Sequence, residues 1–430
     1  MILELKIKNF LSFKEEVTFS FEATRDASFE DYQVVEVVPN IRILRLAIVY
    51  GANASGKSNL IDAFEFLRYF WFNHSDNKDK PTGVTPFLLD RKTPQEPSEF
   101  SLTFYIDGVK YLYSLVLNKK TVFSEKLFIY PETQPAMIFD RVLNENGASE
   151  IVFNPMRVKI NQTAKDEITI KCLANMSVWA AYNQVNVAVP DMENVIKWMK
   201  SQYNLPSIEP HTGLVNYAEH VINKDESMKN VILNFLRRAD FNITDVNTEI
   251  IRESVSEEVV QAILNDIADI SSEEKERLKQ EKTVSRTKTE FEHRIVNNEN
   301  REEFYTLLKK RQSKGTLRTF GLASVICKTI AANAFLAIDE IESSLHPRLV
   351  EFFIEDFLKQ KSQSQLLLTT HYDGLLEEDD LLRKDSIWFT NKKTNGSTEL
   401  YSLADFKGID RISSLQKAYK YGKFGAIPNI

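Results

Sequence analysis

The segment Gly51–Ser58 constrains the fold more than any other part of the sequence. It is Gly-Ala-Asn-Ala-Ser-Gly-Lys-Ser and matches the phosphate-loop pattern G-x-x-x-x-G-K-[ST] in full. An apolar run ending at Tyr50 precedes it, and apolar residues at helical spacing follow from Lys57 to about Phe72. Glycine is scarce, with 13 in 430 residues, so an ordinary glycine turn explains this spacing poorly. A loop of this kind between a buried strand and an amphipathic helix predicts an α/β domain with a nucleotide site.

Each part of this phosphate loop has an expected contact with a nucleoside triphosphate. The backbone N–H groups and the helix N-terminus favour bound phosphates. Lys57 is expected to bridge the β- and γ-phosphates, and Ser58 to offer its hydroxyl to Mg²⁺. The predicted cofactors are ATP and Mg²⁺, and the residues predicted to bind them in this loop are Gly51, Ala52, Asn53, Ala54, Ser55, Gly56, Lys57, Ser58 and Asn59.

An acidic pair far along the chain is predicted to complete the site. Asp339 and Glu340 follow the apolar run Phe335–Ile338, which predicts a buried strand ending at the pair. We expect Asp339 to be a carboxylate linked to Mg²⁺ and Glu340 to polarise the attacking water. Glu342 is a third acid nearby that could share either task.

A histidine follows the next predicted strand. The apolar segment Gln365–Thr369 leads to His371, and polar residues at the carboxyl edge of a sheet face the ligand crevice. We expect His371 to contact the γ-phosphate and to sense its hydrolysis. A structural role at the strand end is the alternative.

The chain is predicted to have three parts: an N-terminal half of the head at 1–176, a mainly helical insertion at 177–301 and a C-terminal half at 302–430. In the first part, apolar and polar residues alternate, which predicts strands, and Asp107-Gly108 predicts a hairpin turn. The insertion is rich in charge and helix formers, as in residues 271–288. It is either a solvated helical face or an arm or lid. The predicted fold class is α/β, with a mixed sheet, helices and an antiparallel β subdomain.

Composition excludes several classes of protein. Apolar residues make up 43% of the chain, as in a globular protein rather than a disordered or fibrous one. The net charge of −7 excludes a protein whose whole surface is positively charged for binding nucleic acid. The two cysteines, Cys172 and Cys327, form no C-x-x-C pair, which argues against a disulfide framework. No membrane span or export signal is visible, so a cytoplasmic location and no membrane partner are expected.

The order of the motifs resembles the ABC-type ATPase heads of the RecF, SMC and OLD groups. After the phosphate loop come Ser-Lys-Gly-Thr at 313–316, Asp-Glu at 339–340, Ser-Leu-His-Pro at 344–347 and Thr-Thr-His at 369–371. The resemblance implies a dimer in which a signature loop, here Gln312–Arg318, reaches the ATP of the partner. Ser313 would offer a hydroxyl and Gly315 an unshielded N–H, at the start of a helix whose positive end faces the γ-phosphate. Ser344–Pro347 would touch the opposite subunit.

Two parts of the resemblance stay open. The segment Ile7–Phe13 is similar to the opening strand of SMC and RecF heads, which flanks the adenine, yet Phe10 and Phe13 are equally suited to a core. No glutamine is evident at the expected Q-loop. Pro86–Leu89 occupies that region, and Gln95 follows.

The C-terminal part resembles the RloA-type, or AbiLi-type, AAA-family ATPases of bacterial phage defence, on the segments 386–389, 399–403 and 421–428. This resemblance implies an ATP-hydrolysing sensor or scaffold, a homodimer or higher homo-oligomer, and an effector encoded in the same operon. That effector would be an RloB-like protein of the Toprim fold.

Two alternatives remain. One is a self-contained nuclease of the OLD type. Those proteins carry a Toprim domain after the ATPase head, and the 59 residues that follow His371 are few for such a domain. A DNA-repair or chromosome-structure ATPase of the RecF or SMC type would bind nucleic acid through a local basic patch, comprising Lys309, Lys310, Arg311, Lys314 and Arg318.

Overall fold

The computed structural model describes residues 1–203, 206–210, 212–239, 241–254, 256–258, 260–261, 276, 280, 282–378 and 380–428. The chain forms two compact units. Met1–Thr212 and Lys328–Ile430 make up the first unit, and Gly213–Cys327 make up the second. These boundaries differ from the sequence-based divisions at 177 and 302, and each unit is described by itself.

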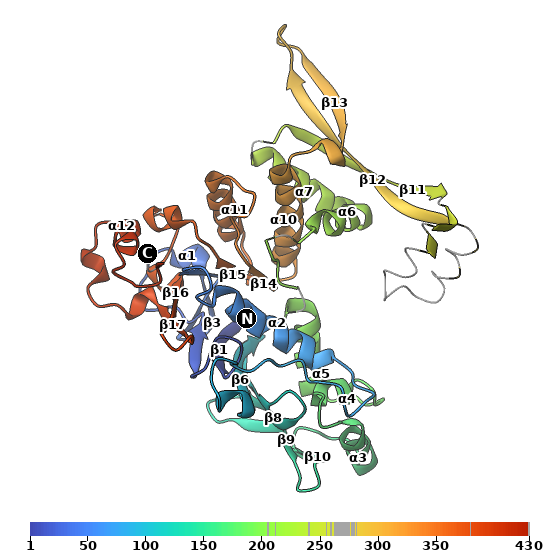
Figure 1. Ribbon diagram of the computed structural model, residues 1–430, viewed down its shortest axis with the longest axis vertical. Coiled ribbons are helices and arrows are strands. Elements are labelled where there is room, and N and C mark those ends of the chain that lie inside the picture. The colour runs from blue at the N-terminus through green and yellow to red at the C-terminus, as the bar shows by residue number, and fades with distance from the viewer. Residues whose placement is uncertain are drawn as a thin grey trace. The chain divides into compact units, whose positions relative to one another are not determined.

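A five-stranded mixed sheet lies at the centre of the first unit. Its strand order is β14 (Phe335–Ile338), β15 (Gln365–Thr369), β5 (Leu46–Gly51), β16 (Ile387–Lys392) and β17 (Thr398–Ser402). All pairings are parallel except that of β16 with β17. Figure 1 shows the early strand, in blue, beside strands from the last hundred residues, in orange to red. Every residue of β5 is buried, as expected of a strand with neighbours on both sides and both faces covered.

A seven-stranded antiparallel sheet forms the second layer of this unit. Its strand order is β10 (Ser149–Phe153), β9 (Ala136–Leu143), β8 (Val122–Tyr130), β7 (Val109–Leu117), β6 (Ser98–Ile106), β1 (Ile2–Lys8) and β2 (Val17–Ser20). The predicted hairpin turn joins β6 to β7, with φ of 47° at Asp107 and 80° at Gly108. A two-stranded sheet of β3 (Val34–Val38) and β4 (Ile41–Leu44) follows the short helix α1 (Glu30–Gln33). The predicted α/β class, with a mixed sheet and an antiparallel β subdomain, is confirmed.

Helix α2 (Lys57–Phe72), predicted with these bounds, packs against both sheets. The ring of Phe64 lies 4.8 Å from that of Phe335 in β14. On another side of the helix, Phe66 stacks on Phe100 of β6 at 4.9 Å. A helix that is apolar around most of its circumference is one that is buried, and α2 fits this rule.

The helices after β10 belong to the first unit, which is why its boundary falls later than predicted. They are α3 (Gln162–Lys171), α4 (Val178–Tyr182), α5 (Pro190–Trp198) and the π-helical turn η2 (Met199–Tyr203). Trp198 stacks on Phe104 of β6 at 4.2 Å, and Trp179 meets Phe139 of β9 edge-on at 5.4 Å. These contacts bring most apolar side chains of the 178–203 segment into the core of the first unit.

The remaining helical elements of this unit are α11 (Pro347–Lys359), α12 (Leu415–Lys420), η1 (Thr93–Gln95), η4 (Asp373–Glu377), η5 (Lys384–Ser386), η6 (Leu403–Asp405) and η7 (Ile409–Arg411). Within the described part of the chain, no helix combines the length and the apolar character needed to cross a membrane.

The second unit combines helices with a long antiparallel sheet. The helical elements are α6 (Leu214–Lys224), α7 (Glu226–Arg238), η3 (Lys309–Arg311) and most of α10 (Lys314–Ala331). The strands are β11 (Ile243–Ser254), β12 (Thr283–Val296) and β13 (Glu302–Leu308), in that order.

The sequence predicts a mainly helical insertion at 177–301, and the three-stranded sheet corrects that prediction. In β12, Thr287, Thr289 and Phe291 alternate with Arg, Lys and Glu, which is the period of a strand with one solvated face. The high content of residues that favour helices led instead to the prediction of a helix. Of the charged run at 271–288, residues 271–275, 277–279 and 281 lie outside the described residues.

We predict that Phe64→Ala lowers the free energy of unfolding by about 3–5 kcal/mol, because it leaves a cavity where α2 meets β14. Tyr69→Ala on the same helix, where the side chain is 50% exposed, is the control and should cost less than about 1 kcal/mol. Urea unfolding followed by tryptophan fluorescence measures both. Equal losses would contradict the packing of α2 described above.

Candidate functional site

The phosphate loop leaves β5 at Gly51 and enters α2 at Lys57, as the sequence predicts. Two of its residues have left-handed backbones, with φ of 58° at Ala54 and 104° at Gly56. A Cβ atom on Gly56 would stand 2.7 Å from Oγ of Ser12, so only glycine fits there without displacement. This curl is the conformation that turns successive N–H groups toward an anion.

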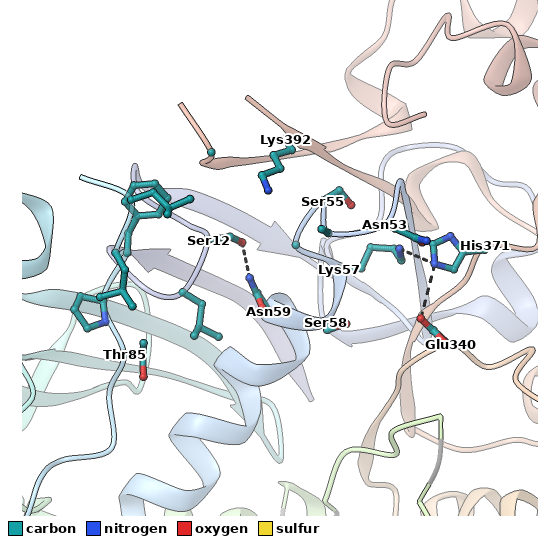
Figure 2. Close-up of a pocket in the computed structure, with 18 residues that line it drawn as sticks. Ser12, Asn53, Ser55, Lys57, Ser58, Asn59, Thr85, Glu340, His371 and Lys392 are labelled. Atoms are coloured by element: carbon teal, nitrogen blue, oxygen red, sulfur yellow. Dashed lines mark hydrogen bonds and ion pairs between the residues drawn. The ribbon is translucent and has the colours of Figure 1, made fainter. Parts of the chain in front are cut away.

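Hydroxyl groups from distant segments hold the loop. Oγ of Ser12 accepts a hydrogen bond from Nδ2 of Asn59 at 2.6 Å (Figure 2). Thr398 Oγ1 lies 2.7 Å from the Ser55 carbonyl oxygen and 2.7 Å from Oγ of Ser12. Thr390 Oγ1 is 2.6 Å from Oγ of Ser55. Sequence reasoning missed Ser12, Thr390 and Thr398, because no motif marks a hydroxyl that supports a loop from elsewhere in the fold.

Lys57 is buried and folds back over the loop. Its Nζ donates to the carbonyl oxygens of Gly51 at 3.0 Å and Ala52 at 3.3 Å. It also lies 3.1 Å from Nε2 of His371 (Figure 2). Burial lowers the pKa of Lys57, while the nearby carboxylates, that of Asp339 foremost, act in the opposite direction. Because a buried ammonium is poorly solvated, an anion bound beside it stabilises its charged form strongly.

The two residues predicted to hold Mg²⁺ are in contact. Oγ of Ser58 donates to Oδ2 of Asp339 at 2.7 Å. The other carboxylate oxygen of Asp339 accepts from the hydroxyl of Thr369, which in turn accepts from the backbone N–H of Glu340 at 2.9 Å. A hydroxyl beside a carboxylate is an oxygen donor set that suits Mg²⁺. The arrangement therefore fits the predicted metal.

Glu340 and Glu342 have different environments. Glu340 has a left-handed backbone, with φ of 45°, and its side chain is 43% exposed. Its Oε1 lies 3.8 Å from Nε2 of His371 (Figure 2). Both oxygens of Glu342 accept hydrogen bonds, from the N–H of His371 at 2.6 Å and the hydroxyl of Thr370 at 2.7 Å. Glu342 thus fixes the loop after β15, whereas Glu340 lines the cavity.

Lys57, Glu340 and His371 line a cavity of roughly 570 Å³, which is in the usual range for a small-molecule ligand. Figure 2 shows His371 and Glu340 to one side of Lys57, and Ser12 and Thr85 to the other. The rest of the lining comprises Leu11, Asn53, Ala54, Ser55, Gly56, Ser58, Asn59, Pro86, Phe87, Leu88, Leu89, Lys392 and Gly396. The cavity therefore combines a polar end with exposed leucine side chains.

The N-terminal segment is part of this cavity, although its phenylalanines are not. Phe10 and Phe13 are buried in the core, while Leu11 and Ser12 line the cavity. The side-chain oxygen of Asn9 accepts from the N–H of Phe87 at 2.9 Å, which anchors the 86–89 segment. The described lining does not include Gln95, which lies in η1.

The predicted signature residues lie in the second unit. Ser313 caps α10, accepting a hydrogen bond from the N–H of Thr316 at 3.0 Å, and Gly315 lies in the first turn of this helix. The segment Ser344–Pro347 lies in the first unit, where Nδ1 of His346 accepts from the N–H of Arg348 at 3.3 Å and caps α11.

A phosphate loop between a central parallel strand and a helix, with an acidic pair after a neighbouring strand, defines a P-loop α/β domain. Within this class, the chain belongs to the family described as "AAA domain, putative AbiEii toxin, Type IV TA system", whose model matches residues 46–377.

Two solved structures are similar to the chain at low identity. The SMC head domain from Thermotoga maritima is 14% identical, with a TM-score of 0.40, over 93% of this chain and 98% of that one. An SMC head bound to the C-terminal winged-helix domain of ScpA is 15% identical, with a TM-score of 0.40, over 97% of this chain and 99% of that one. No curated protein matches.

We predict that His371 titrates below its ordinary pKa of 6.5, because burial and then the Lys57 ammonium disfavour the imidazolium. Lys57→Ala should raise the pKa of His371, since the carboxylates of Glu342, Glu340 and Asp339 would then act unopposed by that cation. Histidine NMR across a pH series measures this pKa. Lys392→Ala, which removes another cavity cation, is the control and should change the pKa little. A pKa that falls or stays constant in Lys57→Ala would contradict this electrostatic account.

Proposed function

We propose that the chain is a Mg²⁺-dependent ATPase whose ATP-bound copies dimerise and control a separate effector in anti-phage defence. The observation that carries the catalytic part is convergence at one edge of the five-stranded sheet. Lys57 and Ser58 from the phosphate loop meet Asp339 after β14 and His371 after β15. Family membership supports a nucleotide-dependent activity.

Each side chain has a task in this proposal. The ammonium of Lys57 exchanges its carbonyl partners for phosphate oxygens. Ser58 and Asp339 bind the Mg²⁺, which neutralises phosphate charge when it is bound. Glu340 accepts the proton of the attacking water, and its exposed carboxylate suits that task better than Glu342, both of whose oxygens are already hydrogen-bonded.

His371 is the residue placed to report the state of the γ-phosphate. Its ring contacts Lys57 and lies near Glu340, while its backbone N–H is held by Glu342. Release of the γ-phosphate would therefore act on the loop after β15 through the side chain of His371.

The regulatory part of the proposal rests on the resemblance to RloA-type ATPases and RecF, SMC and OLD heads. Ser313 and Gly315 would act on the ATP of a partner copy, and the effector would be a Toprim-fold protein encoded nearby. Co-expression with the product of the adjacent open reading frame tests this. A stable complex is expected, and a neighbour without a Toprim fold would contradict the assignment of the effector.

We predict that Lys57→Ala abolishes ATP binding, while Glu340→Gln keeps binding and slows hydrolysis by about 10²–10⁴-fold. Glu340→Gln should also accumulate as an ATP-bound dimer. Binding of a fluorescent ATP analogue, phosphate release and mass photometry measure these effects.

Glu355→Gln on α11 is the matched control, since it makes the same change at an exposed position. It should behave as the unaltered protein does. Hydrolysis at the normal rate in Glu340→Gln would contradict the assignment of the base.

A second candidate function is ATP-dependent action on DNA. The second unit has a cavity of roughly 940 Å³ whose lining includes five basic side chains: Lys224, Arg286, Lys288, Lys309 and Lys310. Two of them already have acidic partners, Lys309 with Glu219 at 2.7 Å and Lys288 with Glu290 at 2.8 Å. Arg318 of the predicted basic patch is buried. The surface suited to phosphates is therefore formed by Lys224, Arg286 and Lys310.

We predict for this candidate a salt-dependent affinity for duplex DNA that Lys224→Glu with Arg286→Glu removes, because each change replaces an attraction to phosphate by a repulsion. Fluorescence anisotropy at several salt concentrations measures the affinity. Lys78→Glu with Lys120→Glu in the first unit is the control for net charge. Equal weakening by both pairs would argue against a DNA site in this cavity.

A further inference from the structure

The cavity of the phosphate loop has a second lysine in its lining, Lys392, which is the last residue of β16. Figure 2 shows its side chain on the Ser12 side of Lys57, away from His371 and Glu340. Lys392 therefore lies toward the end of the cavity that is opposite to the groups assigned to hydrolysis.

The backbone of Lys392 is held against the phosphate loop by both neighbouring strands. β16 pairs with β5 as far as Thr390, which lies opposite Gly51, so Lys392 extends beyond the edge at which the loop begins. In the pairing of β16 with β17, Lys392 lies opposite Thr398. The hydroxyl of Thr398 is 2.7 Å from the carbonyl oxygen of Ser55 in the loop. The two pairings thus fix the position from which the Lys392 side chain extends.

The turn that follows Lys392 is closed by its own hydrogen bonds. The N–H of Lys393 donates to the carbonyl oxygen of Ser397 at 2.8 Å, and the N–H of Gly396 donates to that of Lys393 at 2.9 Å. Gly396 has a left-handed backbone, with φ of 82°, and a Cβ atom there would stand 2.6 Å from Cδ1 of Leu89. The turn therefore lies against the 86–89 segment on the far side of the cavity mouth.

The charge of Lys392 is not neutralised within the described part of the chain. The next residue, Lys393, pairs with Glu399 at 2.8 Å, whereas Lys392 has no acidic partner among the described residues. Glu340 is the one carboxylate in the described lining of the cavity, and it lies at the His371 end (Figure 2). An ammonium without a carboxylate beside it favours an anion at this end of the cavity.

The position of Lys392 relative to Lys57 indicates which phosphate it meets. In the proposed function, Lys57 contacts the distal phosphates, and Glu340 and His371 act at the γ-phosphate. Lys392 lies on the other side of Lys57 (Figure 2). A phosphate chain that begins at His371 and passes Lys57 therefore brings its α-phosphate toward Lys392.

We propose that Lys392 is a further binding residue of this site and that its ammonium binds the α-phosphate of the nucleotide. This inference rests on the proposed nucleotide-dependent function and adds to it a residue outside the phosphate-loop motif. ATP and ADP both have an α-phosphate, so Lys392 holds the product as well as the substrate. Release of the γ-phosphate then changes the contacts of Lys57 and His371 while the contact of Lys392 persists.

The affinities for two nucleotides test this contact in the full chain. Lys392→Gln should weaken the binding of ADP and of the β,γ-imido analogue of ATP by about 10–100-fold each, the effect of losing one hydrogen bond to a charged group. Lys392→Arg keeps the positive charge and should retain most of the affinity for both. Isothermal titration calorimetry with Mg²⁺ and each nucleotide measures these affinities.

Lys393→Gln is the matched control, because it makes the same change at the adjacent lysine, whose ammonium pairs with Glu399. It should bind both nucleotides as the unaltered chain does. Lys392 is exposed, so Lys392→Gln should unfold at the same urea concentration as the unaltered chain. Equal weakening by the two variants would overturn the proposal. Weakening of the ATP analogue alone would show a contact with the γ-phosphate and would overturn it as well.

Sulfur substitution identifies the phosphate that Lys392 contacts. Sulfur accepts hydrogen bonds more weakly than oxygen, so ADP with sulfur in place of a non-bridging α-oxygen should bind the unaltered chain several-fold more weakly in at least one of its two diastereomers. This difference should disappear in Lys392→Gln and remain in Lys393→Gln, because only the first variant removes the interacting group. Equal differences in the unaltered chain and in Lys392→Gln, for both diastereomers, would contradict the contact.

The unaltered chain separates failure of this inference from failure of the proposed function. If it binds neither ADP nor the ATP analogue, the nucleotide site is wrong and both proposals are overturned. If it binds both nucleotides and Lys392→Gln binds them equally well, only the α-phosphate contact is overturned.

Discussion

The parallel pairing of β5 with β15 is the contact on which the site depends. Parallel strands end at the same edge of a sheet, so the loop after β5 and the loop after β15 emerge together. Lys57 and His371 are 314 positions apart in the chain, yet their side-chain nitrogens are 3.1 Å apart. β14 pairs with β15 in turn and adds Asp339 at the same edge.

Much of this arrangement could be predicted from the sequence, because the relevant signals are local and strong. The phosphate-loop motif predicts a strand before it and a helix after it. The apolar run before Gly51 and the helical spacing from Lys57 to Phe72 agree with both predictions. Asp339 and His371 follow short apolar runs, and polar residues that end such strands collect at the carboxyl edge of a parallel sheet. The roles assigned to these residues stay predictions, whereas their proximity is observed.

The parts that could not be predicted depend on contacts between distant segments. Ser12 and Thr398 support the phosphate loop, but a serine in a turn or a threonine at the start of a strand has no distinctive pattern. Glu342 could not be distinguished from Glu340 until its hydrogen bonds to the 370–371 backbone and hydroxyl were visible. In β12, glutamate, lysine and arginine occupy the solvated face of a sheet, so their helix propensity gives the wrong structure.

The position of Lys57 has a consequence for the phosphate loop itself. Its ammonium contacts the carbonyls of Gly51 and Ala52 and the ring of His371, so this one side chain links the two ends of the curled loop to the segment after β15. Any anion that competes for the ammonium would weaken its contact with the imidazole. Because Glu342 holds the His371 backbone separately, a change at the Lys57 contact would act on the ring of His371 and leave its backbone in place.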